Sequence, residues 1–486
     1  MLGKTLTYAL PGDPEIAGLT ADSRAVKPGD LFAALPGGKA DGASFIRDAI
    51  ARGAVAVLAP AGTVLDDART VLVTDDNPRR RFALMAAKFF GRQPQTMVAV
   101  TGTNGKTSVA NFTRQIWSRL ELPAASFGTI GLVSPQRSEA GTLTTPDPVA
   151  LHRLLAELAD EGVTHAAFEA SSHGLDQYRL DGVSLSAAAF TNLTRDHLDY
   201  HGDMDGYWRA KRRLFAELLP DWGTAVVNAD TEQAEDLKNL AQQRGQRVIG
   251  FGTVGEDIRI LKAAPAAAGQ EISLSVMGRR YDLALPLAGD FQVLNAACAL
   301  GLAIATGADV HLATLALETL EGVPGRLQLV ARTATGAAVY VDYAHTPDGL
   351  ETALRALKPH TKNRLIALFG CGGDRDPGKR PMMGAIAARL SDYAIVTDDN
   401  PRTEDAADIR AQVMVGCPNA EEIGDRRSAI RAAIAMAGEG DVVVLAGKGH
   451  ESGQIVGTEV LPFDDAEEAR KAVEGEEARK AGGEGA

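Results

Sequence analysis

The sequence predicts an α/β protein with several domains, in which parallel strands alternate with helices. Short apolar runs such as MVAV, AAFEA and DVVVLAG end in glycine or polar residues and alternate with helical patterns along most of the chain. That alternation is typical of buried parallel strands joined by helices. Glycine is abundant, with 51 residues, which suits many tight strand-to-helix turns. A chain of 486 residues is too long for one hydrophobic core, so we expect roughly three domains.

Segments that contain glycine and proline divide the sequence into three predicted domains. Residues 1–92 contain short strand-like segments and close with the helical pattern RRRFALMAAKFFG before a Gly and Pro linker. Residues 93–326 open with the strand MVAVTG and contain the runs AAFEA, AAAFTNL and TAVVNAD. Residues 327–486 restart the alternation with AVYVDYAHTP, RLIALFGCGG, YAIVTDDNPR and DVVVLAGKGH, which predicts a Rossmann-like domain and a charge-rich helical tail.

Composition excludes several classes of protein. The formal net charge of −13 argues against a nucleic-acid binder, which would normally present a basic face. No apolar run approaches the roughly 20 residues that a membrane helix needs, and the first residues show no secretory signal. The three cysteines are widely spaced and form no CxxC pair, so neither a zinc site nor a disulfide framework is indicated. We expect a cytoplasmic protein that has small-molecule partners and acts as a monomer.

The sharpest single signal is the segment MVAVTGTNGKTSVANF at residues 97–112. A strand runs directly into a glycine loop, then Lys106 and Thr107, then a helix. Backbone N–H groups of such a loop converge on phosphate oxygens, and the helix adds its positive N-terminal end. The loop is shorter than the standard P-loop, because Val100 stands where that pattern has glycine. We therefore predict an ATP-binding loop, in which Lys106 neutralises phosphate charge and Thr107 ligates Mg²⁺.

Polar residues at two later strand ends are predicted to join this loop. Glu169 follows the run HAAF, and Asn192 and His197 follow the run AAAF. A carboxylate and an imidazole beside a triphosphate loop are candidates for holding Mg²⁺, which prefers oxygen ligands. Lys211 lies in the helical segment YWRAKRRLF, where spacing alone favours a solvated lysine.

Several motifs together resemble the Mur ligases, which build the peptide stem of bacterial cell-wall precursors. The matching segments are GTNGKTS, TLTTPD, EASSHGLDQYR, TNLTRDHLDYHG, YxxAKxxLF, GDFQVLNAACA, PGRLQ, DYAHTPD and GCGGDRD. They run in register from about residue 20 to residue 451. The resemblance implies an N-terminal domain for a uridine nucleotide, a central ATPase domain and a C-terminal domain for the incoming amino acid.

The resemblance also implies roles for individual residues. Lys211 matches a lysine that the family carries as a carbamate, and this anion would ligate a second Mg²⁺ together with Glu169 and His197, in addition to the Mg²⁺ that Thr107 ligates. Lys106, Lys211, His197 and Glu169 are thus the expected catalytic residues. The positions that match ATP contacts are Gly102, Thr103, Asn104, Gly105, Lys106, Thr107, Ser108, Asn295, Arg326, Asp342 and His345. The positions that match contacts to the uridine-muramoyl dipeptide are Ala21, Ser23, Gly38, Lys39, Ala40, Thr144, Thr145, Ser171, Gln177 and Arg179.

The C-terminal block indicates which amino acid is added. Its segment DNPR resembles the signature of members that add meso-diaminopimelate, which is lysine with a second carboxylate at its far end. Arg402 can bind that carboxylate through two hydrogen bonds, whereas a lysine substrate would set its ammonium against the guanidinium. The positions that match diaminopimelate contacts are Arg375, Asp399, Asn400, Pro401, Arg402, Gly447 and Glu451. Glu451 is expected to accept a hydrogen bond from the distal ammonium.

The hexapeptide TDDNPR occurs twice, at 74–79 and at 397–402, so it is not diagnostic alone. The first copy precedes an arginine-rich helical pattern, and we interpret it as turn and helix-cap chemistry. Only the second copy lies among the Rossmann-like strands, near GCGGDRD and GKGHE, and we assign the recognition role to that copy.

The implied reaction begins with attack of a glutamyl side-chain carboxylate on the γ-phosphorus of ATP, and the diaminopimelate amine then attacks the acyl phosphate. Alternatives are a lysine-adding member of the family and, more remotely, a folylpolyglutamate synthase-like ligase, which leaves the N-terminal ADSR…GDLF segment without a purpose. A non-catalytic nucleotide-binding regulator would need no amino-acid pocket. A dehydrogenase using GCGG as a dinucleotide loop fails on pattern, because Arg375 stands where the third glycine belongs.

Overall fold

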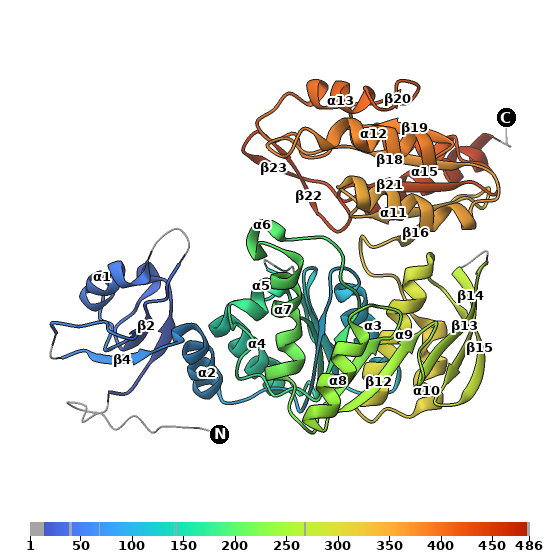
Figure 1. Cartoon of the computed structure of the whole chain (residues 1–486). Helices are drawn as coiled ribbons and strands as arrows, with labels where there is room; N and C mark the ends of the chain where they lie inside the picture. Colours follow the sequence, from blue (N-terminus) through green and yellow to red (C-terminus); the bar gives the residue numbers. More distant parts are fainter. Residues whose placement is uncertain are drawn as a thin grey trace. The chain divides into compact units, whose positions relative to one another are not determined.

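The computed structural model describes residues 14–37, 41–67, 69–139, 141, 143–266 and 269–483, and it confirms the α/β class (Figure 1). The chain forms two compact units. The first comprises residues 1–106, 121–227 and 231–248, and the second comprises residues 107–120, 228–230 and 249–486. The division into three domains at residues 92 and 326 stays a prediction. In the described part of the chain, no helix is long and apolar enough to cross a membrane.

The N-terminal part of the first unit is a small parallel sheet in the order β1-β2-β3-β4. Side chains of α1 pack on one face of this sheet, and those of α2 pack on the other. The elements are β1 (Gly18–Thr20), η1 (Ser23–Ala25), β2 (Asp30–Ala33), η2 (Gly42–Phe45), α1 (Ile46–Ala51), β3 (Ala56–Pro60), β4 (Val71–Asp75) and α2 (Pro78–Phe90).

The first copy of TDDNPR forms the junction of β4 and α2. The Asn77 side chain caps α2 by accepting a hydrogen bond from Arg80 N at 3.0 Å, and Pro78 occupies the first helical turn. Asp75 accepts from Asn77 N at 2.8 Å. The turn-and-cap interpretation of this copy is therefore confirmed.

The rest of the first unit is built on strands in the order β11-β10-β5-β9-β6-β7-β8, of which β11, β10, β5, β9 and β6 are parallel. The strands are β5 (Thr96–Thr101), β6 (Ala124–Gly128), β7 (Gly131–Val133), β8 (Ser138–Glu139), β9 (His165–Glu169), β10 (Ala187–Phe190) and β11 (Thr224–Asn228). The helices are α4 (Pro148–Asp160), α5 (Ser172–Asp176), α6 (Leu198–His201), α7 (Met204–Arg213), the π-helical turn η3 (Leu214–Leu218) and α8 (Ala234–Arg244). Because β5 lies between β9 and β10, the residues that follow these three strands share one sheet edge.

The second unit contains α3 and a mostly antiparallel group of strands. Strand β13 pairs with β12 in parallel and with β14 in antiparallel orientation, and β14 pairs with β15. The elements are α3 (Lys106–Arg119), β12 (Arg247–Gly252), β13 (Ile258–Ala266), β14 (Gly269–Val276), β15 (Arg279–Leu285), α9 (Asp290–Ala305), α10 (Val310–Leu315) and η4 (Ala316–Thr319).

The C-terminal part of the second unit is a doubly wound sheet in the order β16-β17-β21-β18-β19-β20, as the Rossmann-like prediction requires. Helices α11, α12 and α13 pack on one face, and α14 and α15 pack on the other. Its strands are β16 (Gln328–Arg332), β17 (Ala338–Asp342), β18 (Leu365–Phe369), β19 (Tyr393–Val396), β20 (Glu421–Glu422) and β21 (Val442–Ala446). Its helices are α11 (Pro347–Leu357), η5 (Lys358–His360), α12 (Lys379–Leu390), α13 (Ala406–Met414), α14 (Arg426–Ala435) and α15 (Asp465–Gly483). A separate hairpin consists of β22 (Gly453–Val456) and β23 (Glu459–Pro462).

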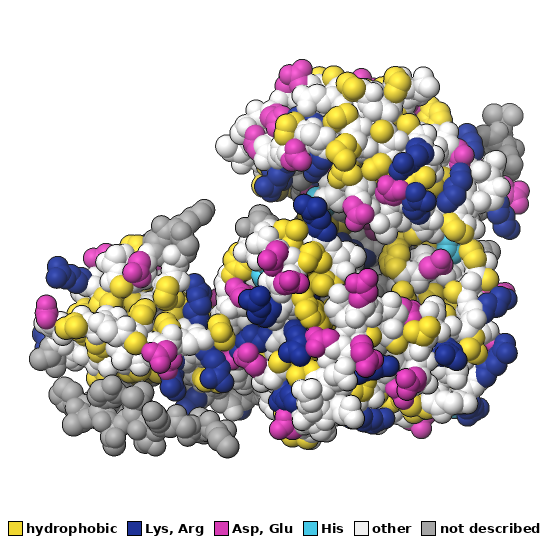
Figure 2. Space-filling model, in the orientation of Figure 1, with side chains coloured by type: hydrophobic (Ala, Val, Ile, Leu, Met, Phe, Trp, Pro, Cys, Tyr) yellow, Lys and Arg dark blue, Asp and Glu magenta, His cyan; other side chains and the backbone are white. Residues whose placement is uncertain are grey.

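The surface carries charges of both signs. On the face drawn in Figure 2, Lys and Arg side chains lie intermixed with Asp and Glu side chains among the described residues.

Packing in the first unit fixes the strand that carries Glu169. Phe168 is 1% exposed, and its ring stacks on that of Phe127 with a centroid distance of 5.1 Å. We expect Phe168→Ala to lower the free energy of unfolding by about 3–5 kcal/mol, because it leaves a cavity beside β9. Urea denaturation measures this loss. Val64→Ala, at an 84% exposed position, is the control and should change stability by less than about 0.5 kcal/mol. Equal effects of the two substitutions would contradict this account of the core.

Candidate functional site

The predicted phosphate loop connects the end of β5 to the start of α3. Lys106 Nζ donates to the carbonyl oxygens of Gly102 at 2.9 Å and Thr103 at 2.8 Å, so the loop curls around this lysine. Gly102 has no room for a side chain, because a Cβ there would lie 1.9 Å from Thr191 Oγ1. Thr107 follows the lysine and is buried in the first turn of α3, as is the next residue, Ser108.

Hydrogen bonds from the end of β10 hold the loop in this shape. Asn104 N donates to Asn192 Oδ1 at 2.9 Å, and Thr103 N donates to Asn192 O at 2.9 Å. Thr191 Oγ1 donates to Asn104 O at 2.6 Å. The structure thus confirms that Asn192 comes to the same edge as the loop.

Lys211 is not the solvated residue that its helical spacing favours. It is 1% exposed, and its Nζ donates to Gly102 O at 2.7 Å, so two lysines share one carbonyl oxygen of the loop. Its Nζ lies 4.3 Å from the centre of the Tyr207 ring. Burial, reinforced by the charge of Lys106, lowers the pKa of Lys211 to about 6. A side chain with so low a pKa is a neutral amine over most of the physiological range.

Glu169 ends β9 and is 2% exposed. Its carboxylate accepts hydrogen bonds from Thr129 N at 2.7 Å and Thr129 Oγ1 at 3.1 Å. Gly128 lies against it, since a Cβ there would meet Glu169 Oε1 at 2.2 Å. Backbone pairing of β9 with β5 aligns Glu169 with Val100, two residues before the loop.

His197 lies on the same side of the first unit but is half exposed. Its ring is 6.0 Å from that of Tyr207, which in turn contacts Thr103 Oγ1 at 3.2 Å. Among the described residues, no group of three or more His, Cys, Asp or Glu side chains is arranged to hold a metal ion. The predicted metal ligands Glu169 and His197 therefore belong to no such group among these residues.

The residues predicted to hold the muramoyl-dipeptide arm form one network beside Glu169. Thr145 Oγ1 donates to Glu169 O at 3.0 Å and accepts from Ser171 N at 3.1 Å. Arg179 donates to Thr145 O at 2.8 Å and to Gln177 Oε1 at 2.8 Å. Thr144 contacts Thr129, which also binds Glu169, with 3.0 Å between the two hydroxyl oxygens. The structure therefore brings these predicted residues together.

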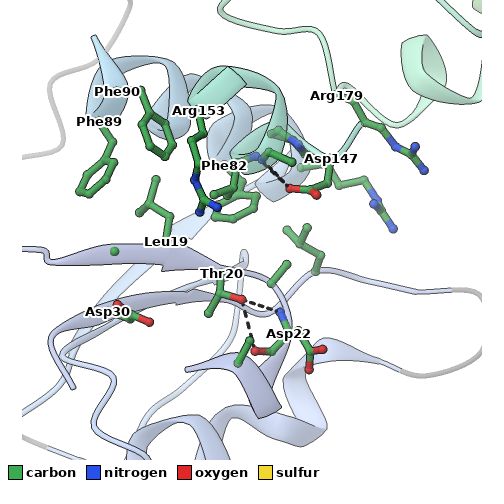
Figure 3. A pocket seen from close by; sticks show the side chains of 18 of the residues that line it. Leu19, Thr20, Asp22, Asp30, Phe82, Phe89, Phe90, Asp147, Arg153 and Arg179 are labelled. Carbon is green, nitrogen blue, oxygen red and sulfur yellow. Dashed lines mark hydrogen bonds between the residues drawn. The ribbon is translucent and has the colours of Figure 1, made fainter. Parts of the chain in front are cut away.

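A cavity of about 870 Å³ opens in the first unit between β1, α2 and α4 (Figure 3). Three of the predicted substrate contacts, Ala21, Gln177 and Arg179, line it, whereas Ser23 does not. Gly38, Lys39 and Ala40 lie outside the described residues. The lining residues that the sequence interpretation missed include Leu19, Asp30, Phe82, Phe89, Phe90 and Arg153. One sequence feature could have indicated this surface, because Phe89 places a large apolar side chain at the end of an amphipathic helical pattern. In the structure this side chain is 41% exposed.

In the second unit, the second copy of TDDNPR follows β19 and forms no helix cap. Arg402 adopts a left-handed backbone conformation with φ 53°. Its backbone is held by the hairpin, because Arg402 N donates to Ile455 O at 3.1 Å and Gly457 N donates to Arg402 O at 2.7 Å. Its Nη1 donates to Gly373 O at 2.8 Å, and Gly373 itself must lack a side chain because a Cβ would lie 1.9 Å from Pro401 O.

The other predicted amino-acid contacts lie around this loop. Arg375, on the loop after β18, is exposed, and its Cγ and Arg402 Nη1 both lie within 4 Å of the position that a Cβ on Gly372 would take. Asn400 Nδ2 donates to Glu451 Oε2 at 2.8 Å. Asp399 is 8% exposed, and its Oδ2 has no hydrogen-bond partner among the described residues. Gly447 leaves space for this oxygen, since a Cβ at 447 would lie 2.6 Å from it. A buried carboxylate oxygen without a partner is a ready acceptor for an ammonium group.

Two of the predicted nucleotide residues of the second unit, Arg326 and His345, lie against Tyr343. The Arg326 guanidinium lies 5.2 Å from the Tyr343 ring centre, and the His345 ring lies 4.5 Å from it. Asp342 accepts from Leu327 N at 2.7 Å, and burial raises the pKa of Asp342 to about 6. Asn295 Nδ2 donates to Gln292 Oε1 at 3.0 Å inside α9.

Comparison with known families and proteins shows which family the chain resembles. Three family models match: "Mur ligase family, catalytic domain" at residues 15–89, "Mur ligase middle domain" at 100–303, and "Mur ligase, glutamate ligase domain" at 325–449. Two relatives named UDP-N-acetylmuramoyl-L-alanyl-D-glutamate–2,6-diaminopimelate ligase are similar over nearly their whole length. That of Rhizobium meliloti (strain 1021) is 54% identical, covering 97% of both chains. That of Caulobacter vibrioides is 56% identical, covering 96% of this chain and 97% of the relative.

Comparison with solved structures leads to the same family. A structure with that same ligase name is 36% identical, has a TM-score of 0.74 and covers 95% of both chains. The MurF ligase of Thermotoga maritima in complex with ADP is 18% identical, with a TM-score of 0.61 over 96% of this chain and 100% of that chain, and shows likeness of fold alone. With family models that match most of its length, and relatives more than half identical along it, the chain belongs to the Mur ligase family.

Proposed function

We propose that this chain is an ATP-dependent ligase that joins meso-2,6-diaminopimelate to the glutamyl side-chain carboxylate of UDP-N-acetylmuramoyl-L-alanyl-D-glutamate, in peptidoglycan precursor synthesis. The observation that carries the proposal is the cluster of hydrogen-bonded loops after β19 and β21, where Arg402 and Glu451 offer a cation and an anion. The distal carbon of diaminopimelate carries the complementary pair, a carboxylate and an ammonium. The relatives that share more than half of the sequence have the matching name.

The first unit supplies the machinery that activates the acid. The substrate carboxylate attacks the γ-phosphorus of ATP, ADP leaves, and an acyl phosphate forms. The amine of the incoming amino acid then attacks the acyl carbon, phosphate leaves, and one proton is released. Lys106 offsets phosphate charge at the N-terminal end of α3. The network of Thr145, Ser171 and Arg179 positions the carboxylate-bearing arm.

Mg²⁺ fits the oxygen donors that this site can offer. The Thr107 hydroxyl would ligate one Mg²⁺, and the buried carboxylate of Glu169, a carbamate on Lys211 and the His197 ring would ligate a second. When bound, the metal would reduce repulsion between the attacking carboxylate and the triphosphate. The buried amine of Lys211 supports the modification. A neutral lysine reacts with CO₂ to give a carbamate and a proton, whereas a protonated one does not.

The cavity in the first unit is proposed to hold the uridine nucleotide. Its aromatic side chains Phe82, Phe89 and Phe90 can pack on a base, and Arg79 and Arg153 can bind diphosphate. Figure 3 shows Arg153 extending from α4 toward the strand that carries Leu19 and Thr20. Since ATP and these precursors are cytoplasmic metabolites, we propose a cytoplasmic site of action and small molecules as partners. We further propose that the chain acts as a monomer.

The substrate assignment predicts the amino acid that drives ATP use. Purified protein with ATP, Mg²⁺ and the uridine-muramoyl dipeptide should release ADP with meso-diaminopimelate and not with lysine or glutamate. The reason is that a distal ammonium alone meets the Arg402 guanidinium as a like charge. A coupled ADP assay and mass spectrometry of the product measure this. Equal ADP release with lysine would identify a lysine-adding ligase instead, and ADP release that no amino acid alters would point to a nucleotide-binding regulator.

Substitutions in the two units should separate activation of the acid from selection of the amine. Lys106→Ala should lower kcat at least about 100-fold, because it removes a preorganised charge from the transferred phosphoryl group. Arg402→Ala should raise the KM for diaminopimelate about 10- to 150-fold, the value of a charge-assisted hydrogen bond of about 1.5–3 kcal/mol. Steady-state kinetics with each substrate varied in turn checks this. An Arg402→Ala variant with the ATP KM raised equally would refute the assignment.

The modification of Lys211 predicts a direct spectroscopic signal. Protein equilibrated with ¹³C-bicarbonate near pH 8 should show a carbamate carbon resonance that is missing from Lys211→Met. Removing CO₂ should lower activity, and bicarbonate should restore it, since above pH 6 the amine is neutral and reactive. Lys471→Met, at an exposed lysine, is the control and should keep the resonance. A wild-type spectrum identical to that of Lys211→Met would exclude the carbamate.

A further inference from the structure

Lys448 is a buried lysine in the GKGHE segment that neither the sequence motifs nor the proposed chemistry assigned a role. It follows β21, and its side chain is 0% exposed. Its Nζ donates to Gly453 O at 2.6 Å, Asn400 Oδ1 at 3.1 Å and Glu451 Oε2 at 3.2 Å. An ammonium has three donor hydrogens, so all three are used by these partners.

The contacts of Lys448 fix which way the Asn400 amide points. Asn400 Oδ1 accepts from both Lys448 Nζ and Ile455 N, the latter at 2.9 Å, while Asn400 Nδ2 donates to Glu451 Oε2. A flipped amide would set its NH₂ group against the ammonium and its oxygen against the carboxylate. Both polar atoms of the Asn400 side chain are therefore held by partners inside the protein, which makes it a support for Glu451.

The same contacts leave one oxygen of Glu451 for a ligand. Oε2 accepts from Asn400 and Lys448, whereas no described residue donates a hydrogen bond to Oε1. The Glu451 side chain is 33% exposed, so Oε1 can meet a substrate. A short turn positions this carboxylate further, because Glu451 N donates to Lys448 O at 3.0 Å.

The hairpin joins Lys448 to the arginine of the second TDDNPR copy. Lys448 binds Gly453 O at the start of β22, and two residues later Ile455 O accepts from Arg402 N. Gln454 Nε2 between them donates to Asp399 O at 2.7 Å. One buried ammonium thus lies at the junction of the segments that carry Asn400, Arg402 and Glu451.

Burying an ammonium costs several kcal/mol unless it is paired and hydrogen-bonded, and a buried pair is often no more stable than an apolar replacement. Stability alone is therefore a weak reason for a lysine at 448. Resting on the proposed function, we propose that Lys448 is a positioning residue for amino-acid selection. It orients Asn400 and Glu451 in advance, so that Glu451 Oε1 receives the distal ammonium of diaminopimelate while Arg402 receives the distal carboxylate.

The test compares two ligands that differ only at the distal ammonium. 2-Aminopimelate keeps both carboxylates and the reacting amino group of diaminopimelate but lacks the second amino group. In Lys448→Met the preference for diaminopimelate over 2-aminopimelate, measured as the inhibition constant of 2-aminopimelate divided by the KM of diaminopimelate, should fall at least about 10-fold, because Glu451 loses its fixed orientation. The KM values for ATP and the dipeptide nucleotide should stay within about twofold.

Lys471→Met is the matched control. Lys471 pairs with Glu468 three residues earlier in sequence and with Glu467, but it is 58% exposed on α15, and its loss should leave the preference unchanged. Lys448→Met that binds both ligands more weakly by the same factor, or that leaves the preference intact, would overturn the proposal and leave Lys448 with a structural role only.

A second variant keeps the test decisive if Lys448→Met does not fold. Asn400→Asp retains a partner for Lys448 but sets a carboxylate oxygen against Glu451 Oε2, so it should also reduce the preference at least about 10-fold. An unchanged preference in Asn400→Asp would contradict the proposal. Failure of the proposed function looks different, because the unsubstituted enzyme would then release no ADP in response to diaminopimelate.

Discussion

The carbonyl oxygen of Gly102 accepts hydrogen bonds from two lysines, and this sharing constrains the chemistry of the first unit. Two ammonium groups on one carbonyl repel each other, and Lys211 is also shut off from water, so its charge is the one that burial removes. Lys106 then carries the positive charge toward phosphate, while Lys211 offers a neutral amine. The two lysines thus have different roles because their surroundings differ. The residue type alone does not show this difference.

In both units, the order of the parallel strands brings the predicted site residues together. Parallel strands bring their carboxyl ends to one edge, so β5, β9 and β10 deliver the loop, Glu169 and Asn192 together. In the second unit, β18, β19 and β21 deliver the segments GCGGDRD, TDDNPR and GKGHE in the same way. The glycines of GCGGDRD allow the backbone to lie against Pro401 and the Arg402 side chain, and this explains the segment without a dinucleotide.

Sequence patterns predicted the features that depend on residues close together in the chain. They did not predict the features that depend on contacts between residues far apart in the sequence. The loop after β5 and the strand-end position of Glu169 could be predicted because apolar runs mark buried strands. The burial of Lys211 could not, since its partner Gly102 lies 109 residues earlier. The two TDDNPR copies show the same limit. Asn77 caps a helix, whereas Asn400 binds Lys448 and Ile455, and this difference comes from the hairpin and the buried lysine around the second copy.

Direct titration of Lys211 is the measurement that tests this account most closely. Protein labelled with ¹⁵N-lysine and held in CO₂-free buffer would give an Nζ resonance for Lys211, assigned by comparison with Lys211→Met. The account predicts a midpoint near pH 6, because the buried amine shares Gly102 O with Lys106. A midpoint near the ordinary lysine pKa of 10.5 would contradict it, since Lys211 would then be a second ammonium at the loop.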